Sequence, residues 1–328
     1  MARTTGNDDV DVVVVGSFNV DHVWRCESLP APGATLAGEY ASGPGGKGFN
    51  QAVAAVRAGA RTAFVCALGD DAGGALARQL AETDGLDLRA LAAAAPTGTA
   101  GIYVDAAGRN SIVIGAGANA LLSAAHVEAQ ADALGSARVV LAQLESPADA
   151  VAAALEAGRR NGAATVLNPA PANAPTTHAL LALADVLTPN ETEFAALAAR
   201  HLGERIDPAD VATLDQPRLH ALCRELAPAA SVVVTLGPIG CFVSHAEGAL
   251  RGDASACYRL GAEPVRAADT TGAGDAFNGA LAASLARDPG LPFAAHVAFA
   301  SRCAALSTER AGAAAAMPRL ADVQARFG

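Results

Sequence analysis

Short β-branched runs alternate with longer alanine- and leucine-rich segments along most of the chain. Apolar runs of this kind are typical of parallel strands buried on both faces. We expect such strands at 10–15, 63–68, 139–143, 164–167, 185–187 and 231–236. Segments rich in helix formers follow them after short turns, and we expect helices at 51–59, 72–82, 147–160 and 218–226. This rhythm predicts an α/β fold on a mostly parallel sheet, with loops at 90–95 and 203–217.

Residues 20–43 and 97–115 interrupt the rhythm. Short strands are expected at 22–26, 34–40, 98–105 and 109–115, as two hairpins. Two hairpins inserted into an α/β chain predict a small β-sheet lid on a domain that covers residues 10–328. The apolar faces of such a lid need a cover, which favours a homodimer through the lid sheets. Residues 1–9 are polar, and we expect a disordered tail there.

The most informative polar stretch is a glycine-rich turn, 269–274, that leads into a helix expected from Ala273 to Arg287. Glycines 272 and 274 permit backbone conformations that side chains forbid, so several N–H groups should converge there. The helix dipole adds positive potential, which suits an anion. Asp275 stands inside this turn, where it could take a proton from a hydroxyl while the turn holds phosphoryl charge. The alternative is an ordinary aspartate cap.

Further polar side chains follow the predicted strands directly. Ligands of open α/β sheets bind at the carboxyl ends of the strands. The residues at this edge are Asn19, Asp21, Glu145, Asn190 and Glu193. Each could be only a turn or capping residue, and their shared edge is what favours a ligand site.

The loop 42–50 contains the one lysine of the chain, Lys47, within Gly45-Gly46-Lys47-Gly48. The glycines match G-x-G-x-x-G literally, but a dinucleotide-binding turn should close the first strand, which ends at Gly16. No Ser or Thr follows Lys47, which excludes a P-loop. The loop could instead bring backbone N–H groups, Lys47 and Asn50 against a polyol.

Composition narrows the class of partner. The chain has 328 residues, 52% of them hydrophobic, and a net charge of −10, which argues against nucleic acid. No apolar run reaches the ~20 residues that a membrane span needs, and the first residues lack the order of a signal peptide. The six cysteines form no C-x-x-C pair, so free thiols in the cytoplasm are expected.

Taken together, the motifs resemble the ribokinase branch of the PfkB carbohydrate kinase family. The stretches that carry the resemblance are 16–21 (Gly-Ser-Phe-Asn-Val-Asp), 45–52, 143–147, 168–171, 188–193, 235–237 and 269–281. The resemblance implies a three-layer, doubly wound sheet and ATP-dependent phosphorylation of a sugar. The expected sugar is D-ribose, phosphorylated at its 5-hydroxyl, with another sugar or a nucleoside as the alternative. A sugar-binding regulator without catalysis is the alternative from another class.

The resemblance also implies roles for single residues. Asp275 would be the general base, beside an anion hole at Gly272, Ala273 and Gly274. The implied sugar ligands are Asn19, Asp21, Gly45, Gly46, Lys47, Asn50, Glu145 and Asp275. The implied ATP ligands are Asn190, Thr235, Gly237, Gly240 and Gly274.

Two metal sites are implied as well. Asn190 and Glu193 would order the Mg²⁺ of ATP through water. Residues Asp269, Thr271, Ser307 and Gly312 would hold K⁺ or another monovalent cation as an activator. Ala316 departs from the family's usual serine at this cation, while Pro238 and Ile239 replace a polar and basic pair at the nucleotide edge.

Overall fold

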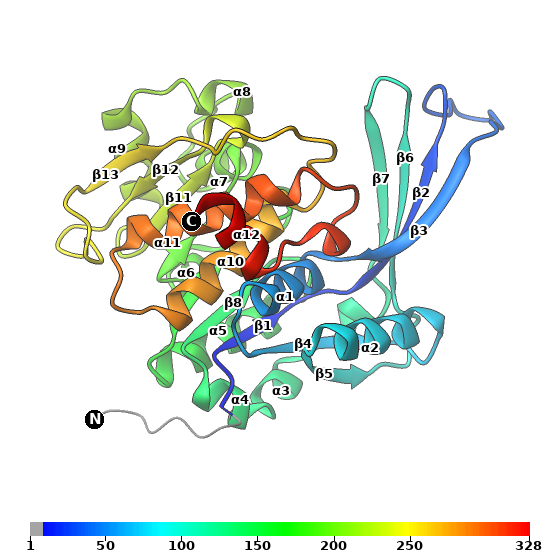
Figure 1. Ribbon diagram of the computed structural model, residues 1–328, viewed down its shortest axis with the longest axis horizontal. Helices are drawn as coiled ribbons and strands as arrows, with labels where there is room; N and C mark the ends of the chain where they lie inside the picture. The colour runs from blue at the N-terminus through cyan, green and yellow to red at the C-terminus, as the bar shows by residue number, and fades with distance from the viewer. Residues whose placement is uncertain (1–8) are drawn as a thin grey trace.

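The computed structural model describes residues 9–328. They form a large sheet with helices on both faces and a small sheet that projects from one end of the body (Figure 1). Of the tail predicted at 1–9, residues 1–8 lie outside the described residues.

The large sheet has nine strands, and every neighbouring pair from β11 to β5 is parallel, whereas β12 and β13 pair antiparallel at one edge. Its spatial order is β13 (Cys257–Leu260), β12 (Cys241–Ser244), β11 (Ser231–Thr235), β10 (Val186–Leu187), β9 (Ala164–Leu167), β8 (Val139–Ala142), β1 (Val12–Val15), β4 (Thr62–Leu68) and β5 (Asp87–Ala92). The mostly parallel sheet predicted from the apolar runs is confirmed.

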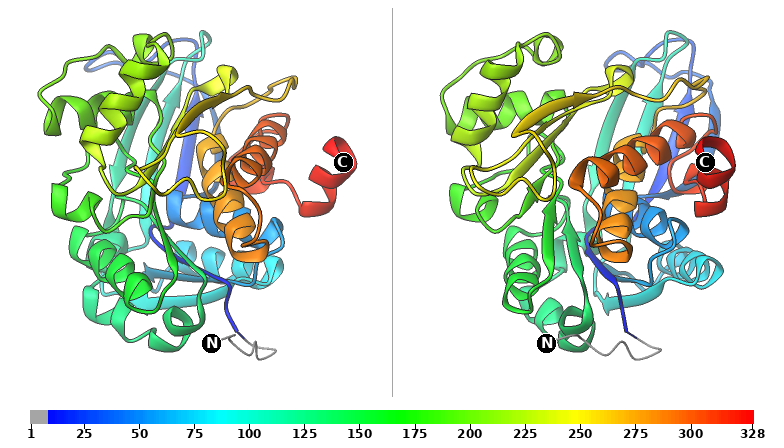
Figure 2. Two further views of the ribbon diagram at one scale, coloured as in Figure 1. Left: turned by 90° about the vertical axis from the view of Figure 1, so that its left-hand side faces the viewer. Right: turned by 60° about the vertical axis from the view of Figure 1, so that its left-hand side comes forward.

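Helices cover both faces because the central strands β1 and β8 are apolar at every position. Val12 and Val14 of β1 pack on one side, and Val13 and Val15 on the other. The first side carries α1 (Lys47–Arg57), α2 (Ala72–Asp84), α10 (Ala273–Arg287), α11 (Phe293–Ser307) and α12 (Leu320–Phe327). The second carries α3 (Ala124–Glu128), α4 (Ala131–Ser136), α5 (Ala148–Arg160), α6 (His178–Leu181), α7 (Glu191–His201), α8 (Pro208–Val211) and α9 (Gln216–Leu226). Figure 2 shows the resulting three layers, which the resemblance implied.

The small sheet has the order β3-β2-β6-β7, from β3 (Glu39–Gly45), β2 (Asn19–Arg25), β6 (Gly98–Val104) and β7 (Asn110–Gly115). The register places Asp21, Ala100 and Ile114 side by side on one face. The opposite face carries a stack of Trp24 with Tyr40 and Tyr103, each at a ring-centroid distance of 5.3 Å. The small sheet beside the main one is therefore confirmed, and its two faces differ in chemistry.

Several boundaries differ from the prediction. The strand predicted at 34–40 is β3, at Glu39–Gly45, and α1 begins at Lys47 rather than at 51. The glycine loop is thus the end of a strand joined directly to a helix. Residues 90–92 belong to β5, and α8 lies within the predicted loop 203–217. Strand β13 and helices α11 and α12 were not predicted. Helix α11 is rich in alanine with a single charged residue, Arg302, so its boundaries are weak in the sequence, while β13 and α12 are short.

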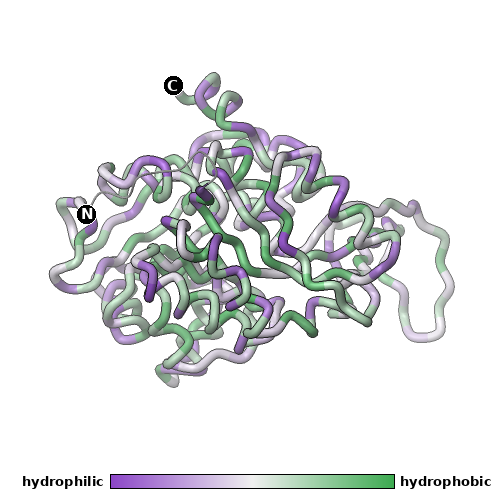
Figure 3. The backbone as a smooth tube through the Cα atoms, turned by 90° about the horizontal axis from the view of Figure 1, so that it is seen from below, coloured by the Kyte–Doolittle hydropathy of each residue, from purple (hydrophilic) through white to green (hydrophobic). Residues whose placement is uncertain are grey.

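Hydrophobic segments run through the centre of the molecule, and hydrophilic segments concentrate at its periphery (Figure 3). Short helices complete the chain as 3-10 turns at η1 (Gly117–Leu121), η2 (Gly237–Ile239) and η3 (Ala314–Ala316). Between residues 9 and 328, the structure has no helix long and apolar enough to traverse a bilayer.

Candidate active site

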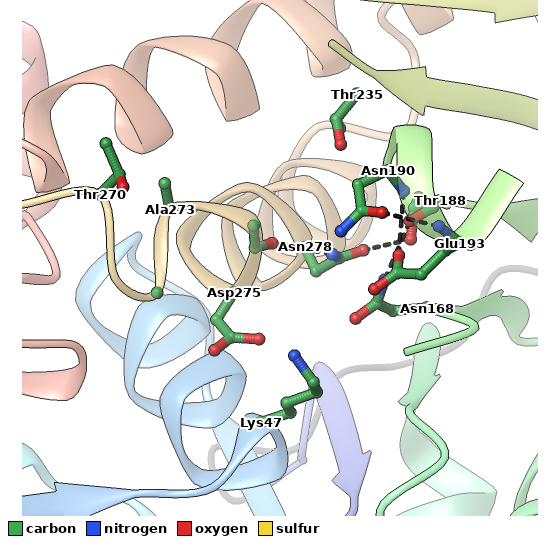
Figure 4. Close-up of a pocket in the computed structure, with 12 residues that line it drawn as sticks. Lys47, Asn168, Thr188, Asn190, Glu193, Thr235, Thr270, Ala273, Asp275 and Asn278 are labelled. Carbon is green, nitrogen blue, oxygen red and sulfur yellow. Dashed lines mark hydrogen bonds between the residues drawn. The ribbon is translucent and has the colours of Figure 1, made fainter. Parts of the chain in front are cut away.

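The first turn of α10 forms the floor of a pocket of about 140 Å³ at the carboxyl edge of the large sheet (Figure 4). Gly272 is the N-cap with a φ of 79°, a conformation that favours glycine. Within residues 9–328, the N–H groups of Gly272, Gly274 and Asp275 have no acceptor, so they remain open to an anion. The N–H of Ala273 instead donates to the carbonyl of Thr270 at 3.2 Å.

Asp275 projects from this turn into the pocket (Figure 4). The residue is 7% exposed, and both carboxylate oxygens accept amide hydrogen bonds of 2.9 Å, Oδ2 from Asn50 and Oδ1 from Gln51. Burial raises the pKa of Asp275, while the Lys47 ammonium and these two hydrogen bonds oppose the rise. The carboxylate is therefore held in one orientation by donors that favour its charged form.

Helices α1 and α10 pack closely enough for these contacts because Gly279 lies at their crossing. A Cβ at Gly279 would overlap the backbone oxygen of Gln51. Asn50 and Gln51 thus reach Asp275 from the first turns of α1, directly after the glycine-rich end of β3. The sequence predicted Asn50 near the sugar, and the structure adds that it contacts Asp275 itself.

The predicted sugar ligands Asn19 and Glu145 have fixed positions. Asn19 Oδ1 accepts a hydrogen bond of 2.8 Å from Asn119, whose side chain also bonds both backbone groups of Phe18. Glu145 Oε2 accepts hydrogen bonds from the Ser17 hydroxyl at 2.6 Å and from the backbone N–H of Lys47 at 2.9 Å. Glu145 therefore links the glycine-rich segment around Lys47 to Ser17, just after the end of β1.

Asp21, on β2, completes the acidic side of the site. Burial, together with the nearby carboxylates of Glu145 and Asp275, raises the pKa of Asp21 to about 6. Lys47 lies among the same carboxylates. Burial alone would lower the pKa of Lys47, but Asp275, Glu145 and Glu193 outweigh it and raise that pKa.

Asn190 and Glu193 begin α7 as a reciprocal capping box. The N–H of Asn190 donates to Glu193 Oε2 at 2.9 Å, and the N–H of Glu193 donates to Asn190 Oδ1 at 2.8 Å. Both side chains line the pocket with Thr235 (Figure 4). The expected ATP residues Gly237, which begins η2, and Gly240, which caps it, are not part of the pocket lining.

The expected cation residues lie behind the turn. Asp269 accepts N–H bonds from Thr271 at 2.9 Å and Gly312 at 3.0 Å, and these bonds lower its pKa although burial would raise it. The Ser307 hydroxyl donates to the Ala304 carbonyl at 2.8 Å. The Ala316 methyl group is buried and offers no oxygen. Asp269 thus ties the turn to the segment at 312.

Sequence reasoning missed a set of buried amides and one hydroxyl around Asp275. They are Gln51, Gln143, Asn168, Thr188 and Asn278. Gln143, Asn168 and Thr188 each follow the end of a parallel strand, so the rule that indicated Glu145 and Asn190 could have found them.

The chain is similar to a known family of proteins. Residues 9–320 match the description "pfkB family carbohydrate kinase". The chain belongs to the PfkB family of carbohydrate kinases. Among its relatives, a ribokinase of Schizosaccharomyces pombe is 35% identical over 97% of this chain and 98% of its own. A deoxyribokinase of Salmonella typhimurium is 32% identical over 83% of this chain and 85% of its own.

Solved structures agree with the fold of this PfkB kinase. The structure of Arabidopsis thaliana ribokinase complexed with ribose and ATP has a TM-score of 0.82 and 29% identity, covering 97% of this chain and 98% of that one. The predicted family, the α/β fold and the ATP-dependent carbohydrate kinase activity are thereby confirmed.

Proposed function

We propose that this chain transfers the γ-phosphoryl group of ATP to the 5-hydroxyl of D-ribose. The observation that carries the proposal is Asn50, whose Nδ2 holds Asp275 while its buried Oδ1 has no hydrogen-bond partner. A buried amide oxygen without a partner costs free energy, and a sugar hydroxyl next to Asp275 would satisfy it. Relatives named ribokinase over nearly the full chain favour ribose as that sugar.

The polar groups suit a small polyol. Asp21 can accept two hydroxyl hydrogen bonds at once. Further donors and acceptors come from Asn19 at the start of β2, Lys47 at the start of α1 and Glu145 after β8. Backbone groups of Gly45 and Gly46 adjoin them. Hydroxyl donors would also offset the repulsion between the Asp21, Glu145 and Asp275 carboxylates that raises the Asp21 pKa.

The transfer uses Asp275 and the turn beside it. The O5 oxygen forms a bond to the γ-phosphorus while the bond from that phosphorus to the β,γ-bridging oxygen breaks, and ADP leaves. Asp275 accepts the proton of the 5-hydroxyl. The transition state is loose, so this proton moves late and most stabilisation is electrostatic. The open N–H groups of Gly272, Gly274 and Asp275 would carry that stabilisation.

Asn190 and Glu193 fit an indirect role toward Mg²⁺. Among residues 9–328, no three His, Cys, Asp or Glu side chains gather at a point where they could hold a metal ion. Glu193 uses Oε2 in the capping box, which leaves Oε1 for a metal-bound water, and burial raises the Glu193 pKa. Mg²⁺ bound to ATP would neutralise phosphate charge, and it keeps several waters of its own. Thr235 and Gly274 line the same pocket as the expected nucleotide ligands.

A monovalent cation at Asp269 is part of the same proposal. Each Asp269 oxygen accepts one backbone N–H bond, so further lone pairs of the carboxylate stay available. The carbonyls near Thr271, Ser307 and Gly312 would complete the site. Ala316 supplies no hydroxyl, so activation by K⁺ should be weaker than with the family's usual serine at this position.

The small sheet would act as a lid and as the dimer interface. The face that carries Asp21 also carries Ile112 and Ile114, which are 51% and 49% exposed. Exposed aliphatic side chains on a sheet face favour burial against a second copy. All six cysteines are free, which suits the reducing cytoplasm.

A coupled assay of ADP release with a panel of acceptors tests the proposal. We expect the highest kcat/KM with D-ribose, and lower values with deoxyribose, fructose and adenosine. A preference for deoxyribose would assign the chain to the activity of its deoxyribokinase relatives. Ribose binding without ADP release would support a regulator and overturn the kinase proposal.

A further inference from the structure

Two buried glutamines form a chain of amides that ends on the Asp275 carboxylate. Gln143 Nε2 donates to Gln51 Oε1 at 2.6 Å, and Gln51 Nε2 donates to Asp275 Oδ1 at 2.9 Å. Both glutamines are 0% exposed, so their side chains are not open to a ligand that enters from solvent. Gln143 immediately follows β8, and Gln51 lies in the second turn of α1.

The direction of this chain is fixed at its far end. Asn168 Nδ2 donates to the backbone carbonyl of Thr188 at 2.9 Å, so its Oδ1 must face Gln51. Gln51 Nε2 donates to that oxygen at 3.1 Å. Gln51 therefore meets two acceptors, Asn168 Oδ1 and Asp275 Oδ1, and only its NH₂ group can satisfy both. A flipped Gln51 would place three oxygens together.

In this arrangement the acceptor oxygen of Gln143 itself is left unsatisfied. Its Oε1 is buried and has no hydrogen-bond partner, and a Cβ at Gly16 would overlap it. An orphaned buried amide oxygen is costly and rare in folded proteins. Its presence is explained if the opposite end of the amide, which supplies a donor to Gln51 Oε1, matters more than the loss.

A second branch links the same amides to the anion-binding turn. The Thr188 hydroxyl donates to Asn278 Oδ1 at 2.5 Å, and Asn278 Nδ2 donates to the Gly274 carbonyl at 2.8 Å. The side chain of Asp275 is thereby connected to the backbone carbonyl of Gly274. The connecting residues are Gln51, Asn168, Thr188 and Asn278. The network spans the ends of β8, β9 and β10 and two turns of α10.

We propose that Gln51 is a positioning residue that holds Asp275 oriented and ionised for proton transfer, and that Gln143, by donating to Gln51 Oε1, reinforces the direction of the Gln51 amide that Asn168 fixes. This inference rests on the proposed role of Asp275 as the base. The charged groups that also face Asp275 are Lys47 on α1, Asp21 on β2, Glu145 after β8 and Glu193 on α7. None of these four is changed in the test.

The test uses Gln51→Met and Gln143→Met, which keep the side-chain length but remove the amide, and methionine also keeps the helix propensity at position 51. A hydrogen bond to a charged group is worth about one pKa unit or more. At saturating sugar and ATP, we expect the acid limb of the kcat–pH profile to move upward by about one unit in Gln51→Met. Turnover at pH 7 should fall roughly 10-fold, and KM for the sugar should change less than about 3-fold, since the sugar ligands are intact.

Gln143→Met should move the limb in the same direction by a smaller amount. Should Gln51→Met fail to fold, Gln143→Met decides the matter, because it lies one step farther from the base. The control is Ser284→Ala on α10, which removes a buried 2.8 Å bond to His296 far from the pocket. It should lower the melting temperature and leave the acid limb in place.

If the acid limb of the kcat–pH profile coincides with that of the wild type in both glutamine variants, the inference is overturned, even if both variants lose stability. The proposed function fails separately, if the wild-type chain releases no ADP with any sugar of the panel.

Discussion

Gly45 lies directly against the carboxylate of Asp21, so that a Cβ at position 45 would overlap the carboxylate oxygens. The two residues lie on the paired strands β2 and β3, at the end of the small sheet that joins the body. The glycine therefore sets where the Asp21 carboxylate can lie, although it supplies no side chain to the site.

Gly45→Ala should displace Asp21 without unfolding the chain, because the overlapping atoms are the free end of a side chain. We expect KM for D-ribose to rise at least 10-fold and KM for ATP to stay within about 2-fold. This is the result expected when a contact is lost that binds the sugar equally in the ground state and the transition state. Steady-state kinetics with each substrate varied in turn measures this. Gly43→Ala is the matched control, since a Cβ there meets no atom within 4 Å. Equal effects of the two alanines on sugar KM would contradict the assignment.

Asp21 should make both sugar affinity and stability depend on pH. Its pKa of about 6 in the folded chain lies above the ordinary 3.8, so folding favours the protonated form. The stability that this proton contributes is present below about pH 4 and is lost as the pH rises to about 6. Asp21→Asn should therefore raise the melting temperature at pH 7 to 8 and have no such effect near pH 4.

The same titration acts on binding in the opposite sense. The ionised carboxylate is the form that accepts two hydroxyl bonds, so kcat/KM for the sugar should fall below about pH 6. Calorimetry of sugar binding at pH 5 and pH 7.5 checks it directly. An Asp21→Asn variant that lost no sugar affinity at pH 7.5 would remove Asp21 from the site.

Asp275→Asn should lower kcat roughly 10²- to 10⁴-fold, the usual range for loss of a general base. The amide keeps the shape of the carboxylate, so the affinity for the sugar, measured by calorimetry, should weaken much less. Turnover near the wild-type value would show that Asp275 is a capping residue. Sequence reasoning reached this residue because the glycine turn, the helix after it and the carboxylate all fall within one short stretch.

Other parts of the site were beyond a reading of local patterns. Gln51 and Gln143 are neutral amides next to apolar stretches of the sequence. Their role depends on three strands and two helices that meet at one point. Asn119, which fixes Asn19, lies 100 residues away in sequence. Strand β3 was displaced in the prediction because Gly43, Pro44 and Gly45 indicate a turn. In the structure they form the strand end, where close approach to Asp21 requires a residue without a side chain.

Charge on the aliphatic face of the small sheet should separate the proposed dimer. Ile112→Lys would place an ammonium group on the face shared with Asp21, where burial against a second copy would leave it unpaired. We expect a monomer by light scattering. Val113→Lys is the matched control, because Val113 is 67% exposed on the opposite face of the same strand and should leave the assembly unchanged. A monomeric wild-type chain would exclude this interface.

Arg57 should support the anion-binding turn from behind. Its guanidinium makes two 2.9 Å bonds to Asp84 and donates to the carbonyls of Ala314 and Met317, each at 3.0 Å. The segment it holds includes Ala313, whose Cα would lie 3.0 Å from a Cβ at Gly272.

Arg57→Met would leave Asp84, only 5% exposed, with the longer 3.4 Å contact to Arg319 in place of its bidentate partner. Breaking a buried ion pair costs about 3–5 kcal/mol, and Arg319 should reduce the loss to about the lower figure or less, which urea unfolding would show as a lower midpoint. KM for ATP should also rise, because the turn that faces the phosphates loses its support. Arg160→Met, which breaks an exposed 3.9 Å pair with Glu156, should cost under about 1 kcal/mol and leave KM for ATP unchanged. If both variants lost the same small amount of stability, the Arg57 guanidinium would contribute no more than a surface ion pair. The turn would then be held by Asp269 alone.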